Sequence, residues 1–136
     1  MFMETNADIS ILIVDDSDMT RETLRVILRS EHYQVVGEAT DGDVAHELAI
    51  KLKPDIILLD VVMPKVSGLE ALKSIKLVMP SVLILMVTAN KDQDTVSEAV
   101  HSGISGYIVK PFNAKKVLDS VASVAAKVRF NRRGQV

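Results

Sequence analysis

Five short apolar segments recur along the chain, and each has the length of a β-strand. They are rich in Ile, Val and Leu and cover residues 8–14, 33–39, 55–60, 81–88 and 106–110. Most are apolar throughout and do not alternate with polar positions. Continuous apolar runs are typical of strands that are covered on both faces, as in a parallel sheet flanked by helices. The pattern therefore predicts a parallel sheet.

Stretches with helical periodicity separate these segments. In the stretch 43–52 the apolar residues recur at every fourth position, namely Val44, Leu48 and Leu52. The stretch 113–129 has a similar valine pattern, and Asn113 is a candidate N-cap for it. A strand followed by a helix thus occurs five times, which predicts an α/β fold with a doubly wound, five-stranded parallel sheet.

The length and composition limit the classes of protein that fit. The 136 residues suit one domain, with a core at about 8–128 and a short basic tail at 129–136. Sixteen basic and eighteen acidic residues give a net charge of −2, which does not favour binding to nucleic acid or membranes. The absence of cysteine excludes disulfides and thiolate metal sites. Without a signal peptide or an apolar run long enough to span a membrane, a cytoplasmic protein is expected.

Polar residues end four of the five predicted strands. The first ends at Asp15 and Asp16, the third at Asp60, the fourth at Thr88 and the fifth at Lys110. Because the carboxyl ends of parallel strands meet at one edge of a sheet, we expect these side chains to share a crevice there.

Helix capping explains other acidic and hydroxyl residues but not this set. The candidate N-caps are Ser17 or Asp18, Asp41, Ser67, and Asp92 or Asp94. One cap per helix is sufficient, so Asp15, Asp16 and Asp60 need another explanation. Clustered carboxylates repel one another by about 4 kcal/mol per pair at 4 Å and an effective dielectric constant near 20, so a cation is expected among them.

The donor types indicate which cation and which reaction fit the crevice. Oxygen ligands without His or Cys suit Mg²⁺ better than zinc. A carboxylate beside Mg²⁺, with Lys110 and Thr88 placed to receive anionic oxygens, favours phosphoryl transfer onto the carboxylate.

The chain resembles the response regulator receiver domains of bacterial two-component signalling, a CheY-like family, from about Ser10 to Val128. Four blocks carry the resemblance: IVDDS at 13–17, DIILLDVVMPKVSGLE at 55–70, MVTAN at 86–90 and GISGYIVKPF at 103–112. The resemblance implies a flavodoxin-like (βα)5 fold with strand order 2-1-3-4-5.

The resemblance also implies a role for each matching residue. Asp60 would be the phosphoacceptor, and Asp15, Asp16, Asp60 and the backbone carbonyl of Val62 would hold Mg²⁺. Thr88 and Lys110 would bind phosphoryl oxygens, and Thr88 and Tyr107 would form the switch. The bond before Pro111 would be cis. The side chains of Val62 and Asn90 would tune how long the phosphoryl group survives.

The expected function follows from these roles. The phosphodonor would be a histidine kinase or phosphotransfer protein, and the chain would perform only its own phosphorylation and dephosphorylation. Its output would act through the surface of the segments 93–101, 106–110 and 113–129 on a protein partner or a further output domain. Neither nucleic acid nor membrane would contact this domain.

Three alternatives remain open at this point. Residues 16–20 read DxDxT, the first motif of haloacid-dehalogenase-type Mg²⁺-dependent phosphatases, although the later strand ends resemble those enzymes less. A flavodoxin-like nucleotide carrier is disfavoured, because the acidic residues 15–18 would repel a phosphate. A receiver-like scaffold that is never phosphorylated is the third, but such proteins usually lack an acidic or Lys position that is present here.

Overall fold

The computed structural model describes residues 6–61, 63, 67–89 and 92–134. The strands are β1 (Ser10–Val14), β2 (Gln34–Ala39), β3 (Ile56–Leu59), β4 (Leu83–Thr88) and β5 (Gly106–Val109). The helices are α1 (Asp18–Ser30), α2 (Gly42–Leu52), α3 (Gly68–Val78), α4 (Gln93–His101) and α5 (Ala114–Arg133), with a 3₁₀ turn η1 (Asn6–Asp8) at the start. The alternating order of strands and helices is the one predicted.

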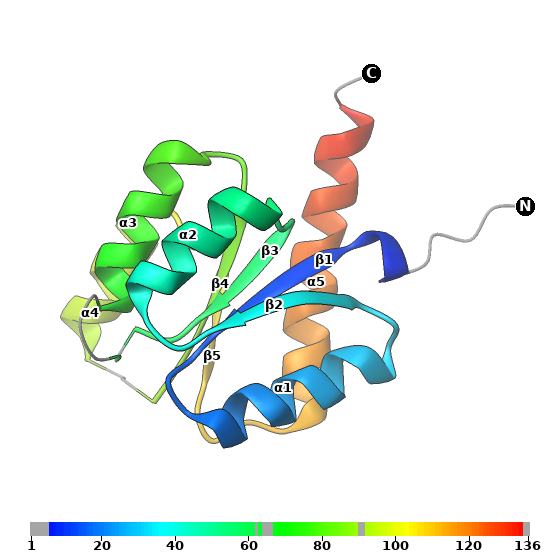
Figure 1. Cartoon of the computed structure of the whole chain (residues 1–136), viewed down its shortest axis with the longest axis horizontal. Coiled ribbons are helices and arrows are strands. Elements are labelled where there is room, and N and C mark those ends of the chain that lie inside the picture. The colour runs from blue at the N-terminus through cyan, green and yellow to red at the C-terminus, as the bar shows by residue number, and fades with distance from the viewer. Residues whose placement is uncertain (1–5, 62, 64–66, 90–91, 135–136) are drawn as a thin grey trace, which may run out of the picture.

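The five strands form one parallel sheet with the order β2-β1-β3-β4-β5 (Figure 1). The order in which strands are added to the sheet changes sides between β1 and β3, because β2 lies on one side of β1 and the later strands lie on the other. A crevice outside the carboxyl ends of the strands forms at such a point. The predicted fold class and the strand order implied by the resemblance are both confirmed.

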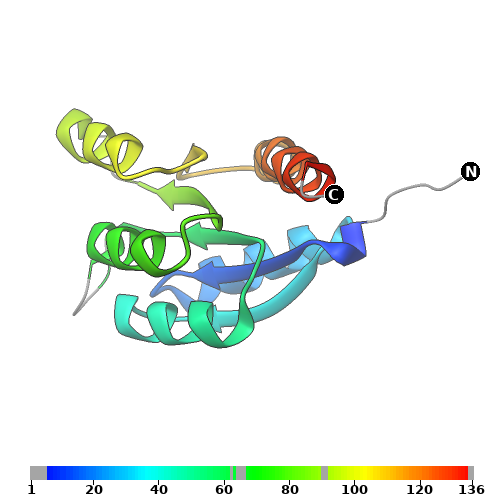
Figure 2. The same cartoon turned by 90° about the horizontal axis from the view of Figure 1, so that it is seen from above.

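Helices cover both faces of the sheet (Figures 1 and 2). Successive strand residues point to opposite faces: Ile11 and Ile13 pack in the layer of α1 and α5, and Leu12 and Val14 pack in the layer of α2, α3 and α4. All four side chains are at most 1% exposed. The continuous apolar runs of the central strands β1, β3 and β4 therefore arise because these strands must fill two cores.

The helices begin at polar caps. In each, a side-chain oxygen of the N-cap accepts a backbone N–H of the first turn, and the caps are Ser17, Asp41, Ser67, Asp92 and Asn113. Such a cap stabilises a helix by about 1 kcal/mol relative to alanine. The capping explanation thus holds for these residues, and it leaves the acids at the ends of β1 and β3 to be explained by another role.

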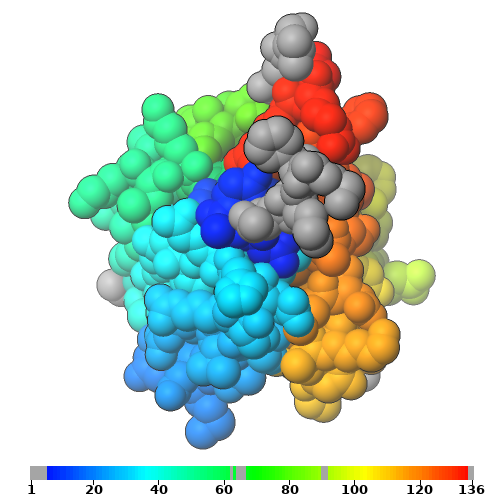
Figure 3. All heavy atoms as spheres, turned by 90° about the vertical axis from the view of Figure 1, so that its right-hand side faces the viewer, coloured from blue at the N-terminus to red at the C-terminus, as the bar shows by residue number. Residues whose placement is uncertain are grey.

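Helix α5 continues to Arg133, beyond the predicted end at 129. The guanidinium of Arg132 lies 3.2 Å from Asp8 Oδ2 and 2.9 Å from Asp55 Oδ2. Figure 3 shows the blue start of the described chain beside the red end of this helix. The basic residues expected in a separate tail are therefore helical as far as Arg133, and Arg132 ties the helix to the amino edge of the sheet.

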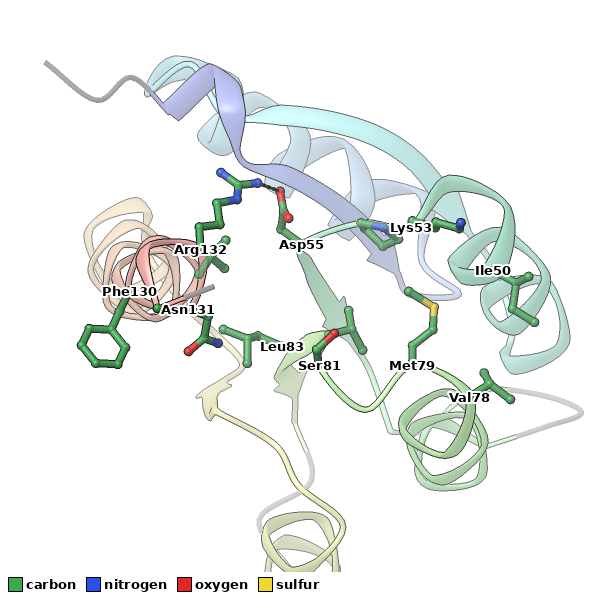
Figure 4. Close-up of a pocket in the computed structure, with 14 residues that line it drawn as sticks. Ile50, Lys53, Asp55, Val78, Met79, Ser81, Leu83, Phe130, Asn131 and Arg132 are labelled. Atoms are coloured by element: carbon green, nitrogen blue, oxygen red, sulfur yellow. Dashed lines mark hydrogen bonds and ion pairs between the residues drawn. The ribbon is translucent and has the colours of Figure 1, made fainter. Parts of the chain in front are cut away.

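A groove of about 860 Å³ lies at that amino edge (Figure 4). It is lined by the ends of α2, α3 and α5 and by Asp55 and Leu83, which stand at the starts of β3 and β4. It is thus on the opposite edge of the sheet from Asp15, Asp60 and Lys110. In the described part of the chain, no helix has the length and apolar character needed to cross a membrane.

Candidate functional site

Asp60 is held at the carboxyl end of β3 by backbone contacts on two sides. Its N–H donates to the carbonyl of Val14 at 2.9 Å, which extends the pairing of β3 with β1. On the other side, the N–H of Gly68 donates to the carbonyl of Val61 at 3.0 Å, so α3 starts against the same turn. Asp60 is 5% exposed, and its carboxylate is therefore presented from a nearly buried position.

The two acids after β1 differ in their surroundings. Asp15 is 1% exposed, and its N–H continues the ladder to β2 by donating to the carbonyl of Ala39 at 3.1 Å. Its Oδ1 accepts the N–H of Ser17 at 2.9 Å, which closes the turn into α1. Asp16, the next residue, is exposed. One acid of the pair is thus built into the fold, whereas the other borders solvent.

Asp15, Asp16 and Asp60 lie close together, as predicted for residues at the carboxyl ends of parallel strands. One carboxylate oxygen from each lies within 4.8 Å of the others. This set contains only oxygen donors, which is the donor chemistry of a hard divalent cation such as Mg²⁺. The residues present therefore fit the ion that the sequence predicts.

Lys110 supplies the positive charge that the structure places among these acids. Its Nζ donates to Asp15 Oδ2 at 2.6 Å and to Asp60 Oδ2 at 3.2 Å. Burial alone would lower the pKa of the Lys110 ammonium, but the hydrogen bond to Asp15 and the charge of Asp60 outweigh it and raise the pKa. Lys110 is therefore a cation in the crevice, and three carboxylates face one ammonium.

The strand ends of β4 and β5 are joined at this site. The N–H of Lys110 donates to the carbonyl of Thr88 at 2.9 Å, and Thr88 is fully buried. The peptide bond between Lys110 and Pro111 is cis, the form that the resemblance implied. Tyr107 on β5 is 47% exposed. Val62 and Asn90, to which the resemblance assigned roles, lie outside the described residues.

Sequence reasoning missed Arg21, whose side chain is only 11% exposed on α1. Its Nη1 donates to the backbone carbonyl of Asp15 at 2.6 Å, and its Nη2 pairs with Asp18. The spacing of Asp18 and Arg21, three positions apart, was a signal for this ion pair. Nothing in the sequence indicated that the same guanidinium would reach back to the acidic turn.

Comparison with known proteins decides the family. Residues 11–122 match the sequence profile described as "Response regulator receiver domain". The chain belongs to the response regulator receiver domain family. Chemotaxis protein CheY of Thermotoga maritima is 38% identical over 115 residues, which are 85% of this chain and 96% of that protein. Transcriptional regulatory protein LnrK of Bacillus subtilis is 40% identical over 85% of this chain but only 53% of its own length.

Solved structures agree with this assignment. The CheX–CheY–BeF₃–Mg²⁺ complex of Borrelia burgdorferi contains a chain that is 32% identical, with a TM-score of 0.80 over 85% of this chain and 88% of that one. The cluster of Asp15, Asp16 and Asp60 thus belongs to a chain of the receiver domain family. The family match sets the phosphatase alternative aside, because the family is that of receiver domains.

Proposed function

We propose that this receiver domain takes a phosphoryl group onto Asp60 from a phosphohistidine of a histidine kinase or phosphotransfer protein. One observation carries the proposal: three carboxylates lie within 4.8 Å of one another, and the Lys110 ammonium lies 3.2 Å from Asp60 Oδ2. A buried cluster of like charges is costly unless cations neutralise it. An ammonium with room for a divalent ion suits the binding of a dianionic phosphoryl group.

Each residue has a distinct role in this proposal. Asp15 and Asp16 would hold Mg²⁺ together with Asp60, and the carbonyl of Val62 would be its further protein ligand, as the family resemblance implies. A bound Mg²⁺ would neutralise the charge on the phosphoryl oxygens and orient them. Lys110 receives another phosphoryl oxygen, and the Thr88 hydroxyl donates to a third.

The phosphoryl transfer needs no reactants other than the phosphohistidine, Asp60 and a proton from solvent. A carboxylate oxygen of Asp60 forms a bond to phosphorus as the bond between phosphorus and the histidine nitrogen breaks. The leaving imidazole takes up a proton from solvent, and Asp60 becomes an acyl phosphate. Because a carboxylate nucleophile has no proton to lose, no general base is required, and the site needs only positioning and charge stabilisation. Water reverses the modification by releasing inorganic phosphate.

In this proposal, phosphorylation changes the surface formed by α4, β5 and α5. Tyr107 and Val100 are exposed there, at 47% and 56% respectively. A protein partner, or an output domain in a longer chain, would read the change. The relatives include both CheY of Thermotoga maritima, of which the match covers 96%, and LnrK, of which it covers 53%, and this supports either arrangement.

Intact-mass spectrometry after treatment with acetyl phosphate and Mg²⁺ tests the proposal. The wild type should gain the mass of one phosphoryl group, and Asp60→Asn should not, because an amide is a poor nucleophile and leaves the metal one charge short. Asp55→Asn is the matched control, since Asp55 lies at the opposite edge of the sheet. Undiminished labelling of Asp60→Asn would move the acceptor to another residue.

A further inference from the structure

Arg21 lies under the turn that carries the metal-binding acids. Its Nη1 donates to the Asp15 carbonyl at 2.6 Å, and its Nε lies 3.4 Å from Glu38 Oε1 on β2. The third partner is Asp18, on the first turn of the same helix. Three acceptors on three segments thus converge on one nearly buried guanidinium, which joins α1 to β2 beneath the acidic turn.

The positive charge of Arg21 is matched locally by acids outside the crevice. Asp18 pairs with it, and Glu38 is shared between Arg21 and Arg25, whose Nη1 lies 2.6 Å from Glu38 Oε2. The guanidinium therefore does not need the metal-binding carboxylates as counter-ions. Its contact with the turn is a hydrogen bond to backbone.

That hydrogen bond fixes the peptide plane between Asp15 and Asp16. The carbonyl of Asp15 and the N–H of Asp16 belong to the same planar unit, so the guanidinium that holds one sets the direction of the other. The remaining polar groups of Asp15 are held by Ala39, Ser17 and Lys110. Asp16 is exposed, and this plane sets where its backbone N and Cα lie.

We propose that Arg21 is a positioning residue for Mg²⁺-dependent phosphorylation, because it orients the Asp15–Asp16 peptide so that the Asp16 carboxylate points at Asp15 and Asp60. The inference rests on the proposed function, since it concerns the same metal site. Arginine is required because a planar group with several donors can bind three acceptors at once, whereas a lysine ammonium is a point charge on a flexible stem.

The sign of the effect on Mg²⁺ affinity separates positioning from charge. Removing a cation near the acids makes the local potential more negative, which by itself tightens Mg²⁺ binding. Losing the correct direction of Asp16 weakens it. Groups that orient metal ligands typically contribute ten- to a hundredfold to affinity, so we expect Arg21→Gln to weaken Mg²⁺ binding about tenfold. Arg25→Gln removes the same charge and a Glu38 contact but not the Asp15 contact, and should bind Mg²⁺ at least as tightly as wild type.

Mg²⁺ titrations followed by the NMR amide shifts of Asp16 and Ser17 test this in wild type, Arg21→Gln, Arg21→Lys and Arg25→Gln. Phosphorylation by acetyl phosphate is measured beside them, and saturating Mg²⁺ should restore most of the Arg21→Gln rate. Equal or tighter Mg²⁺ binding in Arg21→Gln would overturn the inference. So would an equal loss in Arg25→Gln.

Arg21→Lys makes the test independent of folding in Arg21→Gln. A thermal melt without Mg²⁺ shows which variants fold. If Arg21→Lys folds and Arg21→Gln does not, the test uses Arg21→Lys alone. Wild-type Mg²⁺ affinity in Arg21→Lys would then overturn the inference, because a positive charge alone would be sufficient. A weakened affinity supports it. Failure of the wild type itself to bind Mg²⁺ or to be labelled would instead overturn the proposed function, so the two failures are distinguishable.

Discussion

A Cβ atom on Gly68 would lie 2.0 Å from the carbonyl oxygen of Asp60, so α3 begins in direct backbone contact with the residue at the end of β3. The next nearest atom, the Cα of Val61, would be at 2.4 Å. Both are backbone atoms that cannot rotate away. A glycine at the start of α3 is therefore part of what holds the Asp60 carboxylate at its depth in the crevice.

Gly68→Ala should destabilise the fold and displace Asp60. Forcing one methyl group into this contact costs about 1–3 kcal/mol in the free energy of unfolding, because the start of α3 must move off β3. Urea unfolding measures the cost, and the rate of phosphorylation by acetyl phosphate should fall in the same variant.

Gly134→Ala is the matched control for that substitution. The nearest atom to its added Cβ would be the Phe130 carbonyl oxygen at 3.6 Å, an ordinary contact. Its free energy of unfolding should stay within about 0.5 kcal/mol of wild type. Equal free energies of unfolding in the two variants would show that the close approach at Gly68 does not contribute to stability.

Neutralising Asp16 and neutralising Asp15 should have opposite effects on stability without metal. Asp16→Asn removes one repelling charge and breaks no ion pair among the described residues, so it should stabilise the fold by roughly 1 kcal/mol at this exposed position. Asp15→Asn removes the carboxylate that lies 2.6 Å from Lys110 Nζ and should destabilise by about 1–2 kcal/mol, since Asp60 remains as a partner.

Thermal melts with and without Mg²⁺ check both variants. The ion binds only the folded crevice and relieves the repulsion there, so the wild-type melting temperature should rise with Mg²⁺ concentration. Asp16→Asn should lose this response. A full Mg²⁺ response in Asp16→Asn would remove Asp16 from the set of ligands.

The apolar pattern predicted the strands because burial on two faces leaves little freedom of composition. The segment 55–60 contains β3, Ile56–Leu59, in which every residue is buried. The order of the strands was not contained in that pattern, since any order of parallel strands would bury the same runs. It came from the family resemblance, which depends on side chains at the strand ends.

The convergence of the acids was predictable, but their unequal burial was not. Asp15 and Asp16 are adjacent in sequence and equal in chemistry, yet only Asp15 turns inward. The inward direction of Asp15 depends on Lys110, which is 95 positions away, and on the guanidinium of Arg21. The end of α5 was missed for a similar reason, because Arg132 is held by Asp8 and Asp55, which are remote in sequence.

Tyr33 should make the fold sensitive to alkaline pH. Its side chain lies in the core layer of α1 and α5, and burial raises the pKa of its phenol above the ordinary value of 10.0, with Glu31 adding to the shift and Arg129 opposing it. Because the folded pKa is the higher one, this contribution to stability is complete below pH 10.0 and is lost as pH rises through the folded pKa.

The comparison of wild type with Tyr33→Phe isolates that effect. Phenylalanine cannot ionise, so the free energy of unfolding of the wild type should fall relative to the variant as the pH rises above about 10. Urea unfolding at several pH values measures the difference, and other titrating groups cancel in the comparison. A difference that stays constant over this range would contradict the prediction.

Thr88 and Tyr107 lie on neighbouring strands, β4 and β5. In the pairing of β4 with β5, Thr88 is opposite Val109, and Tyr107 is two residues before Val109. Their neighbours Val87 and Ile108 pack in the layer of α1 and α5, so Thr88 and Tyr107 point to the other face, on the side of α4. They are diagonal neighbours across two strands.

Phosphorylation should therefore rearrange α4 and β5 through this pair. Helix α4 buries only Ala99, and an element with so little buried surface is inexpensive to shift. If the Thr88 hydroxyl moves toward the phosphoryl group, space opens beside β5, and the half-exposed Tyr107 ring can turn inward to fill it. Moving the population from 1:99 to 99:1 requires about 5.5 kcal/mol of preference for the active state, which the Lys110 ion pair and the Thr88 hydrogen bond together would supply.

Beryllofluoride, which mimics the phosphoryl group, tests this by NMR shift mapping in wild type and Thr88→Ala. In wild type the shifts should extend from the crevice to Tyr107 and α4. In Thr88→Ala the distant shifts should vanish while Mg²⁺ still binds, because the variant keeps all three carboxylates and Lys110 but lacks the hydroxyl that moves. Wild-type shifts confined to the crevice would rule out this route, and distant shifts that persist in Thr88→Ala would assign the transmission to another residue.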